Sequence, residues 1–175
     1  MKRIILAALF ILLSWGGGFG YYIYLVQSYP INTSTITNAI VVLSPSTKRI
    51  NYGIALLKAG YAPILFIAGI DPHTTLQDIL PELKTIQSQV IYGIDNYTHD
   101  SSASEVVDFI TTHNIKSIRL VAEDYELPKE IEELTQLLPR TNFLNIVPHP
   151  IASKDIPYKL LLYSYNIYLK NLLLY

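Results

Sequence analysis

Residues 39–43, Ala-Ile-Val-Val-Leu, form an apolar run in which polar and apolar side chains do not alternate. A strand of this composition is buried on both faces, which is typical of a parallel sheet. Similar, mostly apolar runs recur at Ile64–Ala68, Val90–Tyr92, Ile118–Ala122 and Phe143–Val147. The recurrence predicts a sheet of five parallel strands.

Between these runs, apolar residues follow helical spacing. Helices are predicted over residues 47–59, 74–87, 102–113 and 128–138. Strands that alternate with helices predict the α/β fold class. We expect a three-layer α/β/α, Rossmann-like domain with a mainly parallel sheet over residues 39–175.

The last segment of the chain, residues 158–175, is strongly apolar but contains Lys159 and Lys170. Only ten residues separate these lysines, which is too few to cross a bilayer. We expect a helix packed against the sheet. The alternative is a helix whose tyrosine and leucine face rests on the membrane surface.

The amino-terminal stretch Ile4–Val26 has twenty-three residues and no charge. As a helix it would reach roughly 34 Å, enough for a hydrocarbon core of about 30 Å. Residues 1–26 are therefore predicted to be a cytoplasmic tip and a transmembrane anchor, with the lipid bilayer as partner of residues 4–26. Because Lys2 and Arg3 precede the stretch, we expect a single-pass protein of the bacterial inner membrane, with its amino terminus cytoplasmic and its α/β domain periplasmic.

A cleaved signal peptide is the alternative to an anchor, because small residues occur around Gly18 and Gly20. The apolar core of a signal peptide typically has about 7 to 15 residues, whereas this run continues through bulky tyrosines. Its length favours the anchor. Residues 27–38 are polar and β-branched, which predicts an extended linker between anchor and domain.

The composition excludes several classes of protein. Thirteen Lys and Arg residues stand against fourteen Asp and Glu residues, and half of the chain is hydrophobic. These values exclude a disordered chain and a strongly basic nucleic-acid binder. The absence of cysteine excludes disulfides, a thiol nucleophile and a cysteine metal site.

In an open parallel sheet, ligands bind beyond the carboxyl ends of the strands. After the first strand the chain offers Ser44, Ser46, Thr47 and Arg49 at the start of a helix, which suits a phosphate or carboxylate. Helix capping is the ordinary alternative for the hydroxyls. Asp71 follows the second strand, where the alternative is a solvated turn residue.

A dense polar run follows the third strand and leads into a helix. Its candidate ligand-binding residues are Ser101, Ser102 and Glu105, and His99 is a candidate proton carrier. A single histidine in a loop is more often simply exposed. Divalent metal binding is not predicted, because the acids and histidines follow no ligand spacing of a known motif.

After the fourth strand, Tyr125 and Lys129 are candidate ligand-binding residues and Glu126 is a second candidate proton carrier. No motif for a dinucleotide, a P-loop, a serine hydrolase or a zincin is present. No cofactor is therefore predicted.

Two segments of the chain carry a family resemblance. The first is AIVVL followed by Arg49, Gly53, Gly60 and an IAGI run that ends at Ile70. The second is SIRLVAEDYELPK, residues 117–129. Together they resemble the SanA/ElyC/YdcF-like family (domain of unknown function 218) over roughly residues 39–147. The resemblance implies a Rossmann-like domain, often anchored to the inner membrane and linked to cell-envelope or peptidoglycan-related processes, with no settled reaction.

The chain departs from that family where chemistry would be expected. Ser44 and Pro45 replace a glycine pair, so the backbone cannot approach a ligand as closely. Glu126 and Lys129 match a histidine and an arginine of the family, which weakens an anion site. Arg49 is the main family-like polar residue retained.

The threonine and asparagine before the family's third helix match His99 and Ser102 here. The sequence leaves two functions, of which the first, with a role in cell-envelope processes, is the predicted one and the second is the alternative. One is binding of a small anionic ligand, phosphorylated or nucleotide-like, held by Arg49 at the carboxyl edge. The other is a non-catalytic interaction module whose ligand pocket is degenerate.

Overall fold

The computed structural model describes residues 1–43, 46–70, 86–94, 102–139 and 143–174. Four candidate site residues, Ser44, Asp71, His99 and Ser101, lie outside this part of the chain, as does most of the helix expected at 74–87.

The centre of the fold is a sheet of five strands that all run in the same direction. The strands are β1 (Ala39–Val42), β2 (Leu65–Ile70), β3 (Val90–Ile94), β4 (Ser117–Glu123) and β5 (Asn145–Ile151), in the spatial order β3-β2-β1-β4-β5. The predicted parallel α/β fold is confirmed. The apolar runs form strands because helices cover both faces of the sheet.

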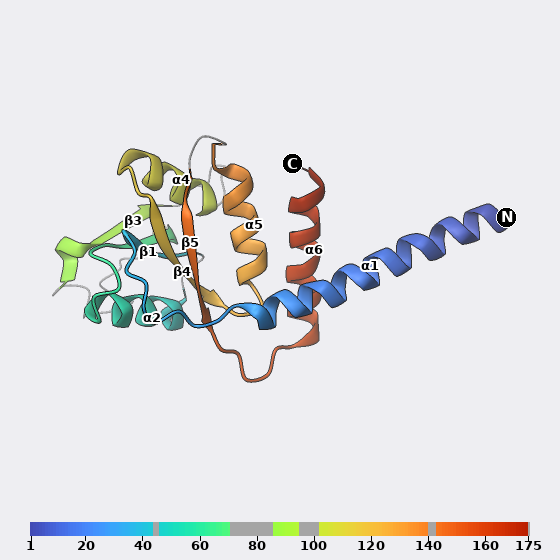
Figure 1. Cartoon of the computed structure of the whole chain (residues 1–175), viewed down its shortest axis with the longest axis horizontal. Helices are drawn as coiled ribbons and strands as arrows, with labels where there is room; N and C mark the ends of the chain where they lie inside the picture. Colours follow the sequence, from blue (N-terminus) through green and yellow to red (C-terminus); the bar gives the residue numbers. More distant parts are fainter. Residues whose placement is uncertain (44–45, 71–85, 95–101, 140–142, 175) are drawn as a thin grey trace.

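Helices form the two outer layers (Figure 1). The helix α2 (Thr47–Lys58) packs on one face, where its Ile50, Ile54 and Leu57 join the core. The opposite face is covered by α4 (Ser102–Thr112) and α5 (Leu127–Leu137). Each helix buries one apolar stripe, as its sequence spacing predicts.

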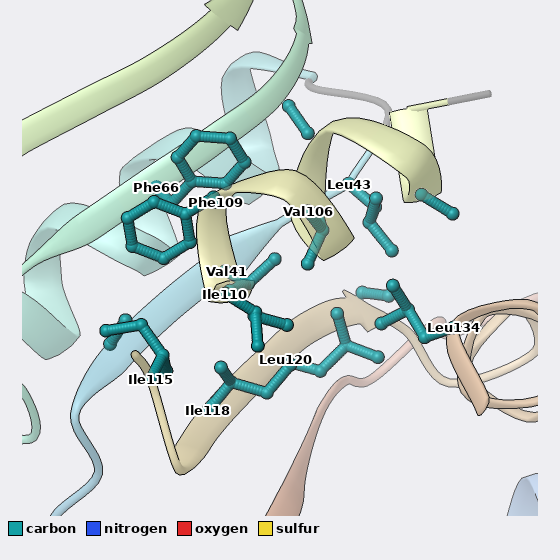
Figure 2. Close-up of a cluster of buried hydrophobic side chains, with 14 of the residues drawn as sticks. Val41, Leu43, Phe66, Val106, Phe109, Ile110, Ile115, Ile118, Leu120 and Leu134 are labelled. Atoms are coloured by element: carbon teal, nitrogen blue, oxygen red, sulfur yellow. The ribbon is translucent and has the colours of Figure 1, made fainter. Parts of the chain in front are cut away.

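The core beneath α4 and α5 is built from branched and aromatic side chains (Figure 2). Phe66 of β2 stacks on Phe109 of α4, with ring centroids 4.2 Å apart. Val41 and Leu120, on neighbouring strands, are fully buried below them. Burial of each such side chain stabilises the fold by about 1.5 to 3 kcal/mol.

Strand β5 begins and ends later than its apolar run suggests. It was predicted at 143–147, yet it covers Asn145–Ile151 and includes Pro148 and Pro150. Among the described strands, β5 lies at the edge of the sheet and pairs only with β4, so proline nitrogens that face away from β4 lose no ladder hydrogen bond and both prolines are tolerated. His149 lies within this strand and is buried.

An extended linker was expected at 27–38, but residues 27 and 28 belong to α1, and the rest of the segment is held against the sheet by Arg119. This arginine is fully buried on β4, on the same face as Val121 and α2. Its guanidinium donates to the carbonyl oxygens of Asn32 at 2.6 Å and Thr35 at 2.5 Å, and it covers the ring of Tyr61. The chain between α1 and β1 is therefore part of the folded domain.

The amino-terminal helix α1 (Lys2–Ser28) projects away from the domain and docks only by its second half (Figure 1). Its Tyr22 is fully buried against Tyr165 of α6 (Tyr158–Leu174) and donates to the carbonyl oxygen of Tyr125 at 2.7 Å. The hydroxyl of Tyr165 donates to the carbonyl oxygen of Trp15 at 2.7 Å. We expected α6 to pack on the sheet, but its main contacts are with α5 and α1.

Candidate functional site

The switch point of the sheet lies between β1 and β4. From β1 the chain proceeds to β2 on one side, whereas β4 and β5 lie on the other. The connections after β1 and β4 therefore diverge, which opens a crevice at their carboxyl ends in folds of this type. Here α2 begins beside β1, and Glu123 ends β4.

Arg49, in the first turn of α2, lies across this crevice. Ser46 caps the helix by accepting a hydrogen bond from the backbone N–H of Arg49 at 3.2 Å, which fixes where the arginine side chain begins. The guanidinium Nε contacts the carboxylate of Glu123, and Nη2 contacts that of Glu126. Nη1 donates to the carbonyl oxygen of Leu43 at 2.7 Å and to Oε1 of Glu130 at 3.2 Å.

Every nitrogen of the Arg49 guanidinium thus has an acceptor within the protein, and the residue is only 5% exposed. Lys129 adds a second cation, with its Nζ 3.3 Å from Oε1 of Glu126. We call these five residues, Arg49, Glu123, Glu126, Lys129 and Glu130, the switch-point cluster. It joins the β1–α2 connection to the β4–α5 connection.

The cluster is unsuited to holding an anion. An incoming phosphate would have to displace a carboxylate from Arg49 and then lie beside the carboxylates that remain. Removing Arg49 would leave buried charges unpaired, which in other proteins destabilises the fold by about 3 to 5 kcal/mol. The arrangement therefore serves as a structural cross-link between the two halves of the sheet.

Glu130 balances the charge of the cluster. Its side chain is buried, and Oε2 has no hydrogen-bond partner among the described residues. Burial raises the pKa of its carboxyl to about 7, although Arg49 and Lys129 act in the opposite direction. When Glu130 is protonated, two cations face two carboxylates among the five residues of the switch-point cluster.

Other candidates from the sequence have different partners. Thr47 is exposed at the start of α2, and Ser102 is the first residue of α4, two strands away from Arg49. Tyr125 packs partly buried against the cluster of Tyr22 and Tyr165, and burial raises the pKa of its hydroxyl, with Glu123 of the switch-point cluster acting in the same direction. Of the described candidates, the structure brings Ser46, Arg49, Glu126 and Lys129 together.

Glu105 performs a separate task at the carboxyl end of β2. Its Oε2 accepts a hydrogen bond from the backbone N–H of Gly69 at 2.8 Å. Gly69 has a φ of +74°, which a side chain would strain. The carboxylate also lies against Gly93 of β3, where no Cβ blocks its approach. Glu105 therefore ties α4 to the edge of β2 and β3.

A cavity of about 480 Å³ opens where α1, the segment after it and α6 meet the carboxyl edge. Most of its lining is apolar, and it is formed by Ile23, Val26, Gln27, Tyr29, Ile31, Asp124, Pro150, Ala152, Ile156 and Leu161. Its one carboxylate, Asp124, already accepts from the backbone N–H groups of Tyr125 at 2.8 Å and Ser153 at 3.1 Å. The cavity suits an apolar group better than a phosphate.

Glu130 and Arg119 were not among the residues predicted from the sequence. Glu126 and Glu130 are four residues apart, so they share a helix face, and this spacing is the signal that would have added Glu130 to the site. Arg119 interrupts an otherwise apolar strand, and a charge in such a position needs buried partners. Among the described residues, no three histidine or acidic side chains are arranged to hold a metal ion.

Fold and site together define a Rossmann-like α/β protein with an amino-terminal membrane-type helix and an ion-paired switch point. No family model matches the chain, and no solved structure matches it. It is 45% identical over 160 residues to the uncharacterized protein RC1356 of Rickettsia conorii, covering 91% of this chain and 92% of that one. It is 39% identical over 173 residues to the uncharacterized protein RP875 of Rickettsia prowazekii, covering 98% of each. The chain belongs to the family of these rickettsial proteins.

The buried carboxyl of Glu130 predicts a pH-dependent stability. A glutamic acid in the unfolded chain loses its proton near pH 4.5, but the folded protein retains it up to about pH 7. The folded state therefore binds more protons between these values, and its stabilisation is lost as pH rises through about 7. Thermal unfolding of the full chain in detergent should show a midpoint that falls from pH 5 to pH 8.

The variant Glu130→Gln keeps the hydrogen bond to Arg49 but cannot ionise, so most of this fall should disappear. Glu132→Gln, a half-buried position on the same helix, is the matched control and should behave like the wild type. Equal pH dependence in wild type and Glu130→Gln would contradict the assignment.

Proposed function

We propose that the protein is a membrane-anchored, non-catalytic interaction module of the bacterial envelope, in which internal ion pairs close the usual ligand edge of the domain. The observation that supports this function is the state of Arg49. Its three nitrogens all contact acceptors of the protein itself, two of which come from the β4–α5 connection.

The competing function, binding of a small anionic ligand, would need the same arginine. Glu126 stands where the resembled family has a histidine, and it contacts both Arg49 and Lys129. A carboxylate in this position forms ion pairs with the two cations that would otherwise attract a phosphate. These contacts therefore support an interaction module with a degenerate ligand pocket better than they support an anion-binding site.

The membrane and envelope parts of the proposal rest on α1 and on the resemblance to the SanA/ElyC/YdcF-like family. Among the residues that the structure describes, α1 is long and apolar enough to cross a membrane. Its only charges, Lys2 and Arg3, lie at its amino-terminal end. By the positive-inside rule this end stays in the cytoplasm, which places the α/β domain on the periplasmic side of the inner membrane.

Ligand screening distinguishes the two functions. The full chain in detergent should show no rise in thermal midpoint with inorganic phosphate, nucleotides, S-adenosylmethionine or polyprenyl phosphates, because a ligand stabilises only a protein that binds it. The control variant is Lys129→Ala, which removes a cation of the cluster and leaves Arg49 paired. A saturable rise in the wild type that is lost in Lys129→Ala would contradict the proposed function.

The orientation is tested with a fusion after Tyr175. Alkaline phosphatase, which is active only outside the cytoplasm, should be active in this position, because the positive residues hold the amino terminus inside. The double variant Lys2→Gln, Arg3→Gln should lower that activity by removing the charge bias. Activity of a reporter that works only in the cytoplasm, fused at the same position, would refute the orientation.

A further inference from the structure

The first half of α1 is exposed on all sides and free to enter a membrane. Residues 2–14 are all exposed, and contacts with α6 begin at Trp15. The indole Nε1 of Trp15 donates to Oδ1 of Asn166 at 3.3 Å, and its carbonyl accepts from Tyr165. At Gly18 the helix backbone comes so close to the Tyr165 hydroxyl that a side chain there would collide with it.

The free part of α1 is too short to cross a bilayer. The thirteen residues 2–14 reach about 20 Å as a helix, roughly 10 Å less than the hydrocarbon core. The remaining length of helix inside the hydrocarbon core must come from the residues after Trp15, which are the residues that contact α6. If α1 spans the membrane in its docked state, α6 comes to the membrane with it.

The position of α6 agrees with this depth. It lies across α1 on the side of the domain from which the free half of α1 projects (Figure 1). Its contacts with α1 lie near its own amino-terminal half, through Tyr158 and Tyr165 against Phe19. A bilayer crossed by α1 would therefore extend along the outer side of α6.

The chemistry of α6 suits the boundary between headgroups and acyl chains. Its exposed large side chains are between 42% and 72% exposed, and they are Tyr158, Leu160, Tyr163, Leu172 and Leu173. Its only charged residues, Lys159 and Lys170, are exposed and cationic. Tyrosine is enriched at this depth, and lysine extends its ammonium toward anionic lipid phosphates.

We propose that α6 is a second membrane-contacting helix, whose exposed tyrosine, leucine and lysine side chains lie in the headgroup boundary of the bilayer that α1 crosses. The domain then rests on the membrane in one orientation instead of moving on a free tether. This inference rests on the membrane anchoring by α1 in the proposed function, and its test separates the two.

The absence of native cysteine permits single-cysteine labelling of the full chain. Tyr163→Cys and Leu173→Cys place a fluorophore on the exposed side of α6, and Phe10→Cys places one on the free half of α1. Tyr52→Cys, an exposed position on α2, is the matched control. Each variant is reconstituted in phosphatidylcholine–phosphatidylglycerol vesicles that carry brominated acyl chains, which quench only fluorophores at membrane depth.

We expect loss of fluorescence at Phe10→Cys and at both α6 positions, and none at Tyr52→Cys. Quenching at Phe10→Cys with none on α6 would overturn the inference while leaving the anchor in place, including the case in which a second copy of the chain covers α6. Absence of quenching at Phe10→Cys would instead refute the anchor itself.

Discussion

The contact between one buried guanidinium and three carboxylates is the interaction on which the carboxyl edge depends. Arg49 comes from the connection after β1, and its carboxylate partners come from β4 and the start of α5. Because the connections after β1 and β4 lead to opposite sides of the sheet, the ligand crevice would lie between them. In this protein, ion pairs fill the crevice. The position where such folds usually bind a ligand therefore holds a structural cross-link.

A second constraint couples the membrane helix to the domain. Arg119 fixes the segment after α1 by bonds to Asn32 and Thr35, and Tyr22 is buried between α1, α6 and the loop that holds Tyr125. Burial lowers the pKa of the Arg119 guanidinium. Its hydrogen bonds to the two carbonyl oxygens hold the backbone of this segment in place. Buried contacts therefore determine the orientation of the sheet relative to α1. A flexible linker would allow many orientations.

The sequence predicted much of the fold, because apolar runs and helical spacing report burial directly. It misplaced β5, because two prolines mark a strand end in most contexts and are tolerated here only at the open side of an edge strand. At the site, the strand order brings Arg49 and Glu126 together as the parallel sheet predicts. Arg49 follows β1 and Glu126 follows β4, so the two residues are far apart in the sequence. Sequence spacing alone could therefore not show that Glu126 pairs with Arg49 instead of binding a ligand.

The Arg49 guanidinium is paired with carboxylates of its own chain. Nitrogen-detected NMR of the full chain in detergent, with the signal identified by its loss in Arg49→Lys, observes this group directly. A buried ion pair predicts an Nε–H that exchanges slowly with water and keeps its chemical shift when excess phosphate is added. Fast exchange, or a shift that saturates with phosphate, would contradict the account.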